Sequence, residues 1–301
     1  MTISDQAKAH VMQIGRAAVA VAVLLAALKF WAYLQTGSST VLSSLLDSST
    51  DVLVSLMTWA SLRYSVRPPD EDHRFGHGKI EGITALIQGV LLAIGGMLLI
   101  YEGVHRLIAP VPVVAPELGV GVLLFSLVVS WVLVWAQTRV VKRHKSLAIE
   151  ADRGHYTGDM LMNGGAALIL VLVPLTGWLW LDALFALVVG GVMGVLALQI
   201  GRKAVDMLLD REVEAEIKHK IAHAILTDPR ITRMHDLRVI RHGMRLMVTY
   251  DIEMDGAVSL KEAHDIAVAS EDRILADHPH AEIMVHMDPV GVDHNRRHHC
   301  G

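Results

Sequence analysis

The sequence predicts a two-part membrane protein: an all-α bundle of six transmembrane helices, followed by a cytoplasmic α+β domain. Of the 301 residues, 52% are hydrophobic and 19% charged, and the mean hydropathy is +0.42. This composition is too apolar for an ordinary soluble domain. Long apolar blocks end near Ile200, after which charged residues return at soluble density. We therefore expect a membrane domain at 1–206, a cytoplasmic domain at 207–290 and a flexible, His-rich tail at 291–301.

Six windows approach the length of about 20 apolar residues that a bilayer requires. They are 14–33, 41–62, 83–108, 118–140, 155–175 and 179–200. An even number places both termini on one side. Lys and Arg gather in two of the connecting segments, 63–79 and 139–153. By the positive-inside rule, these loops and both termini are predicted to be cytoplasmic in a protein of the cell's inner membrane.

The C-terminal part alternates helical and strand patterns. Residues 212–227 have helical spacing, and two alternating stretches at 236–241 and 245–253 form a hairpin across the turn at Gly243. Ser259, with Glu262 three residues later, begins a second helix, and 281–286 is a last strand. The order α-β-β-α-β predicts an open-faced sandwich.

Composition excludes several classes of protein. The net charge of -4 provides no basic field, so nucleic acid is excluded as a partner. Cys300 is the single cysteine, which rules out a disulfide framework and a thiolate metal site. No Gly-rich loop with Lys and Ser/Thr is present, which argues against an ATP-driven pump. The polar start of the chain lacks a cleavable signal pattern, so the first helix should be retained.

Two predicted membrane helices carry ionisable pairs at a spacing of four. Asp47 and Asp51 share one helix face, as do His155 and Asp159. Such residues are costly inside a membrane, and four N/O ligands from two helices can complete a tetrahedral divalent-metal site. The alternative is two structural pairs, Lys29 with Asp47 and His155 with Asp159. Because neighbouring carboxylates repel unless a cation or proton joins them, we favour the metal site.

The loop after the second helix offers another ligand set. Asp70, His73 and His77 could bind a second ion at the cytoplasmic surface, and the glycines on either side of His77 suit a tight bend. A solvated loop whose histidines merely lie close in sequence is the alternative. The sequence predicts a surface metal site here.

Eleven of the 17 histidines follow Asp206. Several of them, with two aspartates, lie on the predicted strands and second helix, where they could converge on one sheet edge: His235, Asp251, His264, His286 and Asp288. His298 and His299 in the tail are either a loose scavenging segment or without function. The cytoplasmic domain is thus a candidate metal-binding domain.

Catalysis fits the pattern less well than transport. An acyltransferase with a His and an Asp five apart would need a Ser or Cys nucleophile, and none is evident nearby. Intramembrane metal hydrolysis would need an open coordination position, whereas four protein ligands fill a tetrahedron. We therefore expect no enzyme. A membrane-anchored metal sensor or chaperone is the main alternative, although an anchor needs no buried charge.

Three motifs in this order resemble the cation diffusion facilitator family, especially its bacterial zinc and iron efflux members. They are Leu46-Asp47-Ser48-Ser49-Thr50-Asp51, Phe75-Gly76-His77-Gly78-Lys79 and His155-Tyr156-Thr157-Gly158-Asp159. The resemblance implies a homodimer with a metallochaperone-like cytoplasmic domain. It also implies inward-facing and outward-facing states that exchange metal for protons at Asp47, Asp51, His155 and Asp159, with the loop site at Asp70, His73 and His77.

The resemblance further implies a binuclear cytoplasmic site and a dimer charge pair. The binuclear site matches His235, Asp251, His264, His286 and Asp288. The charge pair matches Lys79 and Asp210. Asp251 stands where zinc exporters usually have a histidine, and its harder, anionic oxygen puts the occupancy or metal preference of that site in question.

The ligands themselves suggest proton coupling, because protons and a divalent ion compete for the same His and carboxylate atoms. His155 is the expected switch, since a free imidazole has a pKa of about 6.5. Zn²⁺ is ranked first and Fe²⁺ second as the transported and regulatory ion, with Cd²⁺, Mn²⁺ and cobalt also compatible.

Overall fold

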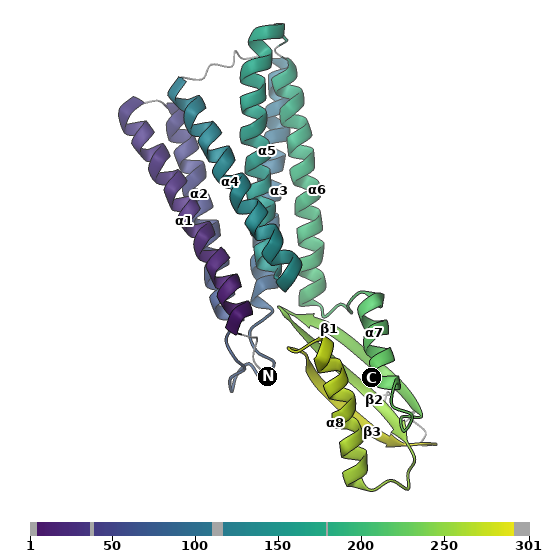
Figure 1. Ribbon diagram of the computed structural model, residues 1–301. Helices are drawn as coiled ribbons and strands as arrows, with labels where there is room; N and C mark the ends of the chain where they lie inside the picture. Colours follow the sequence, from purple (N-terminus) through teal and green to yellow (C-terminus); the bar gives the residue numbers. More distant parts are fainter. Residues whose placement is uncertain (1–4, 37–38, 110–116, 179, 292–301) are drawn as a thin grey trace. The chain divides into compact units, whose positions relative to one another are not determined.

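A computed structural model describes residues 5–36, 39–109, 117–178 and 180–291 (Figure 1). Two compact units are present, one up to Leu208 and one from Leu209 onward. The predicted tail at 291–301 lies outside the described residues except for Gly291.

The first unit contains the six predicted helices: α1 (Asp5–Thr36), α2 (Ser39–Ser65), α3 (Ile80–Ile108), α4 (Glu117–His144), α5 (Leu147–Thr176) and α6 (Trp180–Leu208). Three of them, α1, α5 and α6, extend well beyond the predicted apolar windows, because these helices continue into polar residues at one end. Counted over the described residues, five are long and apolar enough to cross a membrane. The exception is α2, whose hydropathy is lowered by Asp47, Asp51 and many hydroxyl residues.

Small residues let α3 and α6 pack closely. They recur every seven residues on both helices, at Gly82, Gly89, Gly96 and Gly103 of α3 and at Ala183, Gly190, Ala197 and Ala204 of α6. A Cβ atom at Gly96 would lie 2.9 Å from the Gly190 carbonyl oxygen, and one at Gly190 would lie 2.7 Å from the Gly96 carbonyl oxygen. The backbones can approach this closely only without side chains.

A buried carboxylate supports the start of α5. Glu81 of α3 accepts hydrogen bonds from the hydroxyls of Ser65, at 2.8 Å, and Ser146, at 2.5 Å. The Ala148 backbone N–H also donates to it, at 3.4 Å. A carboxylate beside the free N–H groups of a helix N-terminus is stabilising. Glu81 therefore ties α2 and α3 to the beginning of α5.

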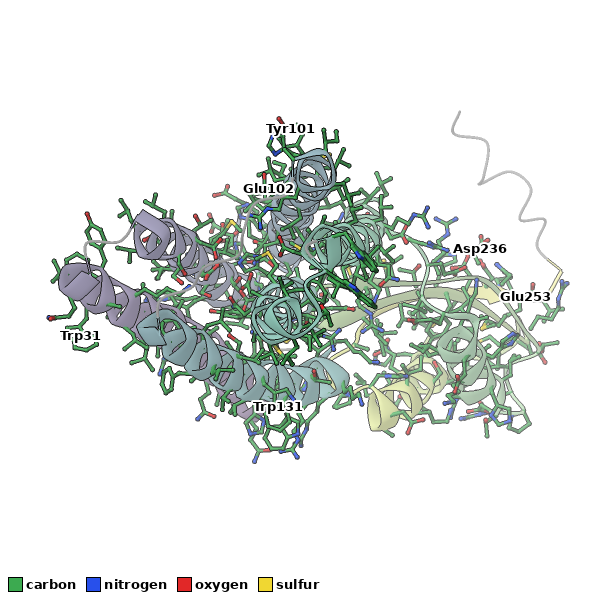
Figure 2. All side chains as sticks on the ribbon, turned by 90° about the horizontal axis from the view of Figure 1, so that it is seen from above. Trp31, Tyr101, Glu102, Trp131, Asp236 and Glu253 are labelled. Atoms are coloured by element: carbon green, nitrogen blue, oxygen red, sulfur yellow. The ribbon has the colours of Figure 1, made fainter. Side chains whose placement is uncertain are left out.

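The outer surface of the bundle is apolar and aromatic. Figure 2 shows Trp31, Tyr101 and Trp131 pointing away from the helices, and all three are more than half exposed. The Arg139 guanidinium lies 3.4 Å from the centre of the Trp135 ring. Exposed aromatic and aliphatic side chains of this kind suit a lipid environment.

The second unit has the predicted α-β-β-α-β order: α7 (Ala215–Leu226), β1 (Arg233–His242), β2 (Arg245–Met254), α8 (Leu260–Asp277) and β3 (Glu282–Pro289). The sheet order is β1-β2-β3, antiparallel and then parallel. The two helices pack against each other and against the sheet, around a core that includes Ile225, Val239 and Ile266.

Local signals at the sheet and helix ends mostly follow the prediction. Gly243 has a φ of 63° in the hairpin, and the Ser259 hydroxyl accepts the Glu262 backbone N–H at the start of α8. The first strand starts three residues earlier than predicted, at Arg233. A bulge between His235 and Arg238 interrupts its alternation, with Asp236 at a φ of 51°.

Candidate metal centres

The first candidate centre lies between α2 and α5. His155 Nε2 is 3.0 Å from Asp51 Oδ1 and 3.8 Å from Asp159 Oδ2. One ligand atom from each of these three residues falls within 4.8 Å of the other two. Spacing of four places His155 and Asp159 on one face of α5, and that face meets Asp51 of α2. We call this set the intramembrane group.

The intramembrane group has the donors that a divalent cation requires. Asp51 and Asp159 are buried and His155 is largely so. Within the described part of the chain, Asp159 Oδ2 accepts no hydrogen bond although it is buried. A buried carboxylate oxygen without a donor is unfavourable, and a cation beside it would remove that cost. Two carboxylates and one imidazole thus fit a divalent metal ion.

The structure does not bring Asp47 into this group. It lies one turn before Asp51 on α2 and is exposed. Nearby, the Lys29 ammonium is buried and donates to the Ser48 hydroxyl at 2.6 Å and to the Ser44 carbonyl oxygen at 3.2 Å. A fourth ligand from Asp47 would require α2 or its side chain to shift relative to the three residues already together.

The loop between α2 and α3 forms a second candidate centre. Asp70 Oδ1 is 3.1 Å from His73 Nδ1, and Asp70 Oδ2 is 3.2 Å from His77 Nε2. The two imidazole rings lie 4.6 Å apart, and Tyr64 packs against the His77 ring edge-on. The His73 backbone N–H and ring lower the pKa of Asp70, which keeps this ligand ionised. All three predicted loop residues are together.

A third candidate centre crosses the three strands of the sheet. The ladder aligns His235 of β1 with Asp251 of β2, and Asp251 with His286 of β3. His235 Nδ1 is 3.5 Å from Asp251 Oδ2, and His235 Nε2 is 3.9 Å from Asp288 Oδ2. His286 Nε2 lies 3.1 Å from Asp288 Oδ1. His235, Asp251 and Asp288 form what we call the sheet group.

One carboxylate that sequence reasoning missed lies beside the sheet group, and two predicted histidines, His264 and His286, lie outside it. Glu253 is buried, with Oε1 3.6 Å from His235 Nε2 (labelled in Figure 2). Its position two residues after Asp251 puts it on the same strand face, so the two-residue alternation of a β-strand could have identified it. His264, on an exposed position of α8, is not among the residues brought together here.

Lys79 and Asp210 fall in different units. Lys79 is the residue before the first turn of α3, and Asp210 follows α6 with a φ of 55°. Their pairing stays a proposal.

Comparison with known proteins matches both units to one family. The family described as "Cation efflux transmembrane domain" matches residues 16–209, and "Cation efflux protein, cytoplasmic domain" matches residues 213–290. Three relatives illustrate the match, and each is named "Cation-efflux pump FieF". The protein from Shewanella oneidensis is 37% identical over 97% of this chain and 99% of its own length.

Further relatives have the same extent. The protein from Pectobacterium carotovorum is 40% identical over 93% of both chains, and that from Escherichia coli is 37% identical over 92% of both. The matches cover nearly the whole chain with its two units in the same order. The chain therefore belongs to the cation diffusion facilitator family of cation-efflux transporters.

Proposed function

We propose that this protein is an efflux transporter for divalent transition-metal ions, which it exchanges for protons as a homodimer in the cell's inner membrane. The intramembrane group carries the proposal, because two carboxylates and an imidazole within 4.8 Å form a cation-binding set on two helices of the bundle. The relatives' names as cation-efflux pumps support the direction of transport.

The chemistry of the group favours zinc, with iron(II) second. Oxygen and nitrogen donors accept both ions and also cadmium, manganese and cobalt, while the usual order of affinities places zinc above iron and manganese. Protons bind the same atoms, so metal loading releases protons and protonation releases metal. The relatives' names as cation-efflux pumps favour transport over catalysis.

The remaining proposals concern topology and assembly. The loops 63–79 and 139–153 are rich in Lys and Arg, which supports cytoplasmic termini. The short name of the matching cytoplasmic family, ZT_dimer, supports a homodimer. Lys79 and Asp210 would form its charge pair, and the loop and sheet groups would bind regulatory ions. Alternating access would require α2 and α5 to move relative to the other helices.

The deciding experiment is metal uptake into proteoliposomes with an imposed pH gradient. Wild type and Asp51→Ala are compared with zinc, iron(II), manganese and cadmium tested separately. We expect wild type to move zinc in the direction opposite to the flow of protons, and Asp51→Ala to move no zinc. Ser49→Ala, an exposed position on the same helix, is the matched control and should transport normally.

A membrane-anchored metal sensor is the rival function, and the sheet group is the observation that favours it. A sensor predicts that neither wild type nor Asp51→Ala moves metal, while the full-length protein binds zinc and loses that binding on His235→Ala. Transport by wild type that survives Asp51→Ala would also refute the proposal, because the intramembrane group would not then be the route.

A further inference from the structure

A buried polar stripe continues from the intramembrane group along α2. After Asp51, it consists of Ser55, Thr58, Ser61 and Ser65, at successive spacings of four, three, three and four residues. All four side chains are at most 5% exposed. The proposed function uses none of them. Hydroxyl groups in the interior of an apolar bundle need polar partners, and the partners are informative.

The centre of the stripe is a cluster of four polar side chains from four helices. Thr58 Oγ1 of α2 lies 3.2 Å from Asp152 Oδ1 of α5 and 3.0 Å from the Val54 carbonyl oxygen, and its one hydrogen can be donated to either acceptor. Gln137 of α4 donates from Nε2 to Asp152 Oδ2 at 2.6 Å, and Gln88 of α3 donates from Nε2 to Thr58 Oγ1, also at 2.6 Å. Each of the four is at most 2% exposed. We call them the oxygen cluster.

Two oxygen atoms of this cluster lack donors. Gln88 Oε1 and Gln137 Oε1 are buried and accept no hydrogen bond from any residue that the structure describes. The amide nitrogens face the cluster instead. A half-turn about the last side-chain bond exchanges the two ends of an amide. The cluster would then present a carboxylate, a hydroxyl and two amide oxygens, which are the donors that hard cations select.

The position of the cluster relates it to the intramembrane group. Asp152 precedes His155 by three residues on α5, a rise of about 4.5 Å. The Tyr156 hydroxyl lies 2.9 Å from the hydroxyl of Ser55, which stands one turn after Asp51 on α2, and 3.3 Å from the Ala18 carbonyl oxygen. Beyond the cluster, the Ser65 hydroxyl donates to Glu81 of α3, which also contacts the start of α5. Polar groups thus extend from the intramembrane group toward the N-terminal end of α5.

We propose that Thr58, Gln88, Gln137 and Asp152 form a second, all-oxygen cation site, which the transported ion occupies on its way between the N-terminal end of α5 and the intramembrane group. This inference rests on the proposed function. With one carboxylate and no imidazole, the site binds more weakly than the intramembrane group and prefers harder ions. The competing account is a hydrogen-bonded clasp that only holds four helices together.

Equilibrium binding of Mn²⁺ to the full-length protein in detergent tests the site, with bound ions counted by loss of the free-ion electron paramagnetic resonance signal. The background is Asp51→Ala, in which the intramembrane group is disabled. Adding Asp152→Asn, which keeps the size of the side chain, should remove one further Mn²⁺ per protomer. The control Ser126→Ala, a buried hydroxyl of α4 outside the cluster, should leave the count unchanged.

A second variant gives a change in the opposite direction, which a misfolded protein cannot produce. Gln137→Glu adds a carboxylate to the cluster and should tighten Mn²⁺ binding about tenfold, because affinity follows ligand charge. An unchanged Mn²⁺ count with Asp152→Asn, together with no tightening by Gln137→Glu, would overturn the site and leave the clasp. Failure of the proposed function is read separately, as continued metal uptake by Asp51→Ala.

Discussion

The intramembrane group and the sheet group use similar donors on different supports. Asp51, His155 and Asp159 belong to two helices that share only side-chain contacts, whereas His235 and Asp251 face each other in a ladder of backbone hydrogen bonds. Helices can slide or tilt without breaking their own hydrogen bonds, but strands in a ladder cannot separate without losing them. The two helices therefore suit a site that binds and releases its ion, and the strand ladder suits a site of fixed geometry.

The largest effect is expected from removing a ligand of the intramembrane group. Asp159→Ala removes a ligand, and because outer-shell partners alone change metal affinity by about 10–100-fold, zinc uptake should fall at least 100-fold. Binding at the sheet group should not change. Proteoliposome uptake and zinc titration check the two parts. Thr157→Ala on the same helix is the control, and an equal loss there would contradict the ligand role of Asp159.

A smaller effect is expected from loosening the helix support itself. Gly190→Ala places a Cβ atom 2.7 Å from the Gly96 carbonyl oxygen, so the α3 and α6 backbones must separate. We expect a loss of about 1–3 kcal/mol in the stability of the bundle. Thermal unfolding in detergent measures it. Gly191→Ala, where the added Cβ atom meets nothing within 4 Å, should leave the stability unchanged. Equal stability of the two variants would refute the close packing of α3 against α6.

One substitution should change the metal preference of the sheet group. Asp251→His replaces a hard oxygen by an imidazole beside His235, so binding of zinc relative to manganese should rise by about tenfold. Competition titration of the full-length protein measures this ratio. Asp272→His, at an exposed position of α8, is the control. No change in the ratio would mean that Asp251 does not contact the bound ion.

The smallest effect concerns a charge cluster that shares no residue with the metal groups. Hydrogen bonds from Arg230 lower the pKa of Asp228 to about 2, and Arg273 lies 3.6 Å away. A carboxyl group with a lowered pKa stabilises the folded state above its unfolded pKa of about 3.9, and this contribution is lost as the pH falls toward 2.

Asp228→Asn should therefore lower the unfolding temperature of the cytoplasmic unit at pH 7. The difference from wild type should shrink once the pH falls below about 4. Asp272→Asn serves as the exposed control. A difference that stays constant down to pH 3 would show that the Asp228 contribution is not electrostatic.

Sequence patterns predicted the elements well where local chemistry decides the structure. The helix start at Ser259 and the turn at Gly243 follow from a cap and a glycine. The early start of β1 was missed because Asp236 adopts a left-handed conformation that alternation does not reveal. Periodicity alone predicts which residues share a face, and so it united His155 with Asp159.

Contacts between distant segments were harder to predict. Asp47 and His264 lie outside the sets of ligand atoms that the structure brings within 4.8 Å of one another, because spacing along one helix does not specify which neighbour that face meets. Asp152, Gln88 and Gln137 were overlooked for the same reason, since each lies on a different helix. Only the packing of four helices brings them together.

The most direct test of the account combines zinc binding with proton release. In a full-length variant carrying His73→Ala and His235→Ala, the intramembrane group is the strongest remaining binding set. The account predicts one tightly bound zinc per protomer with protons released on binding, and the loss of both when Asp51→Ala is added. Tight zinc binding and proton release that persist unchanged without Asp51 would contradict it.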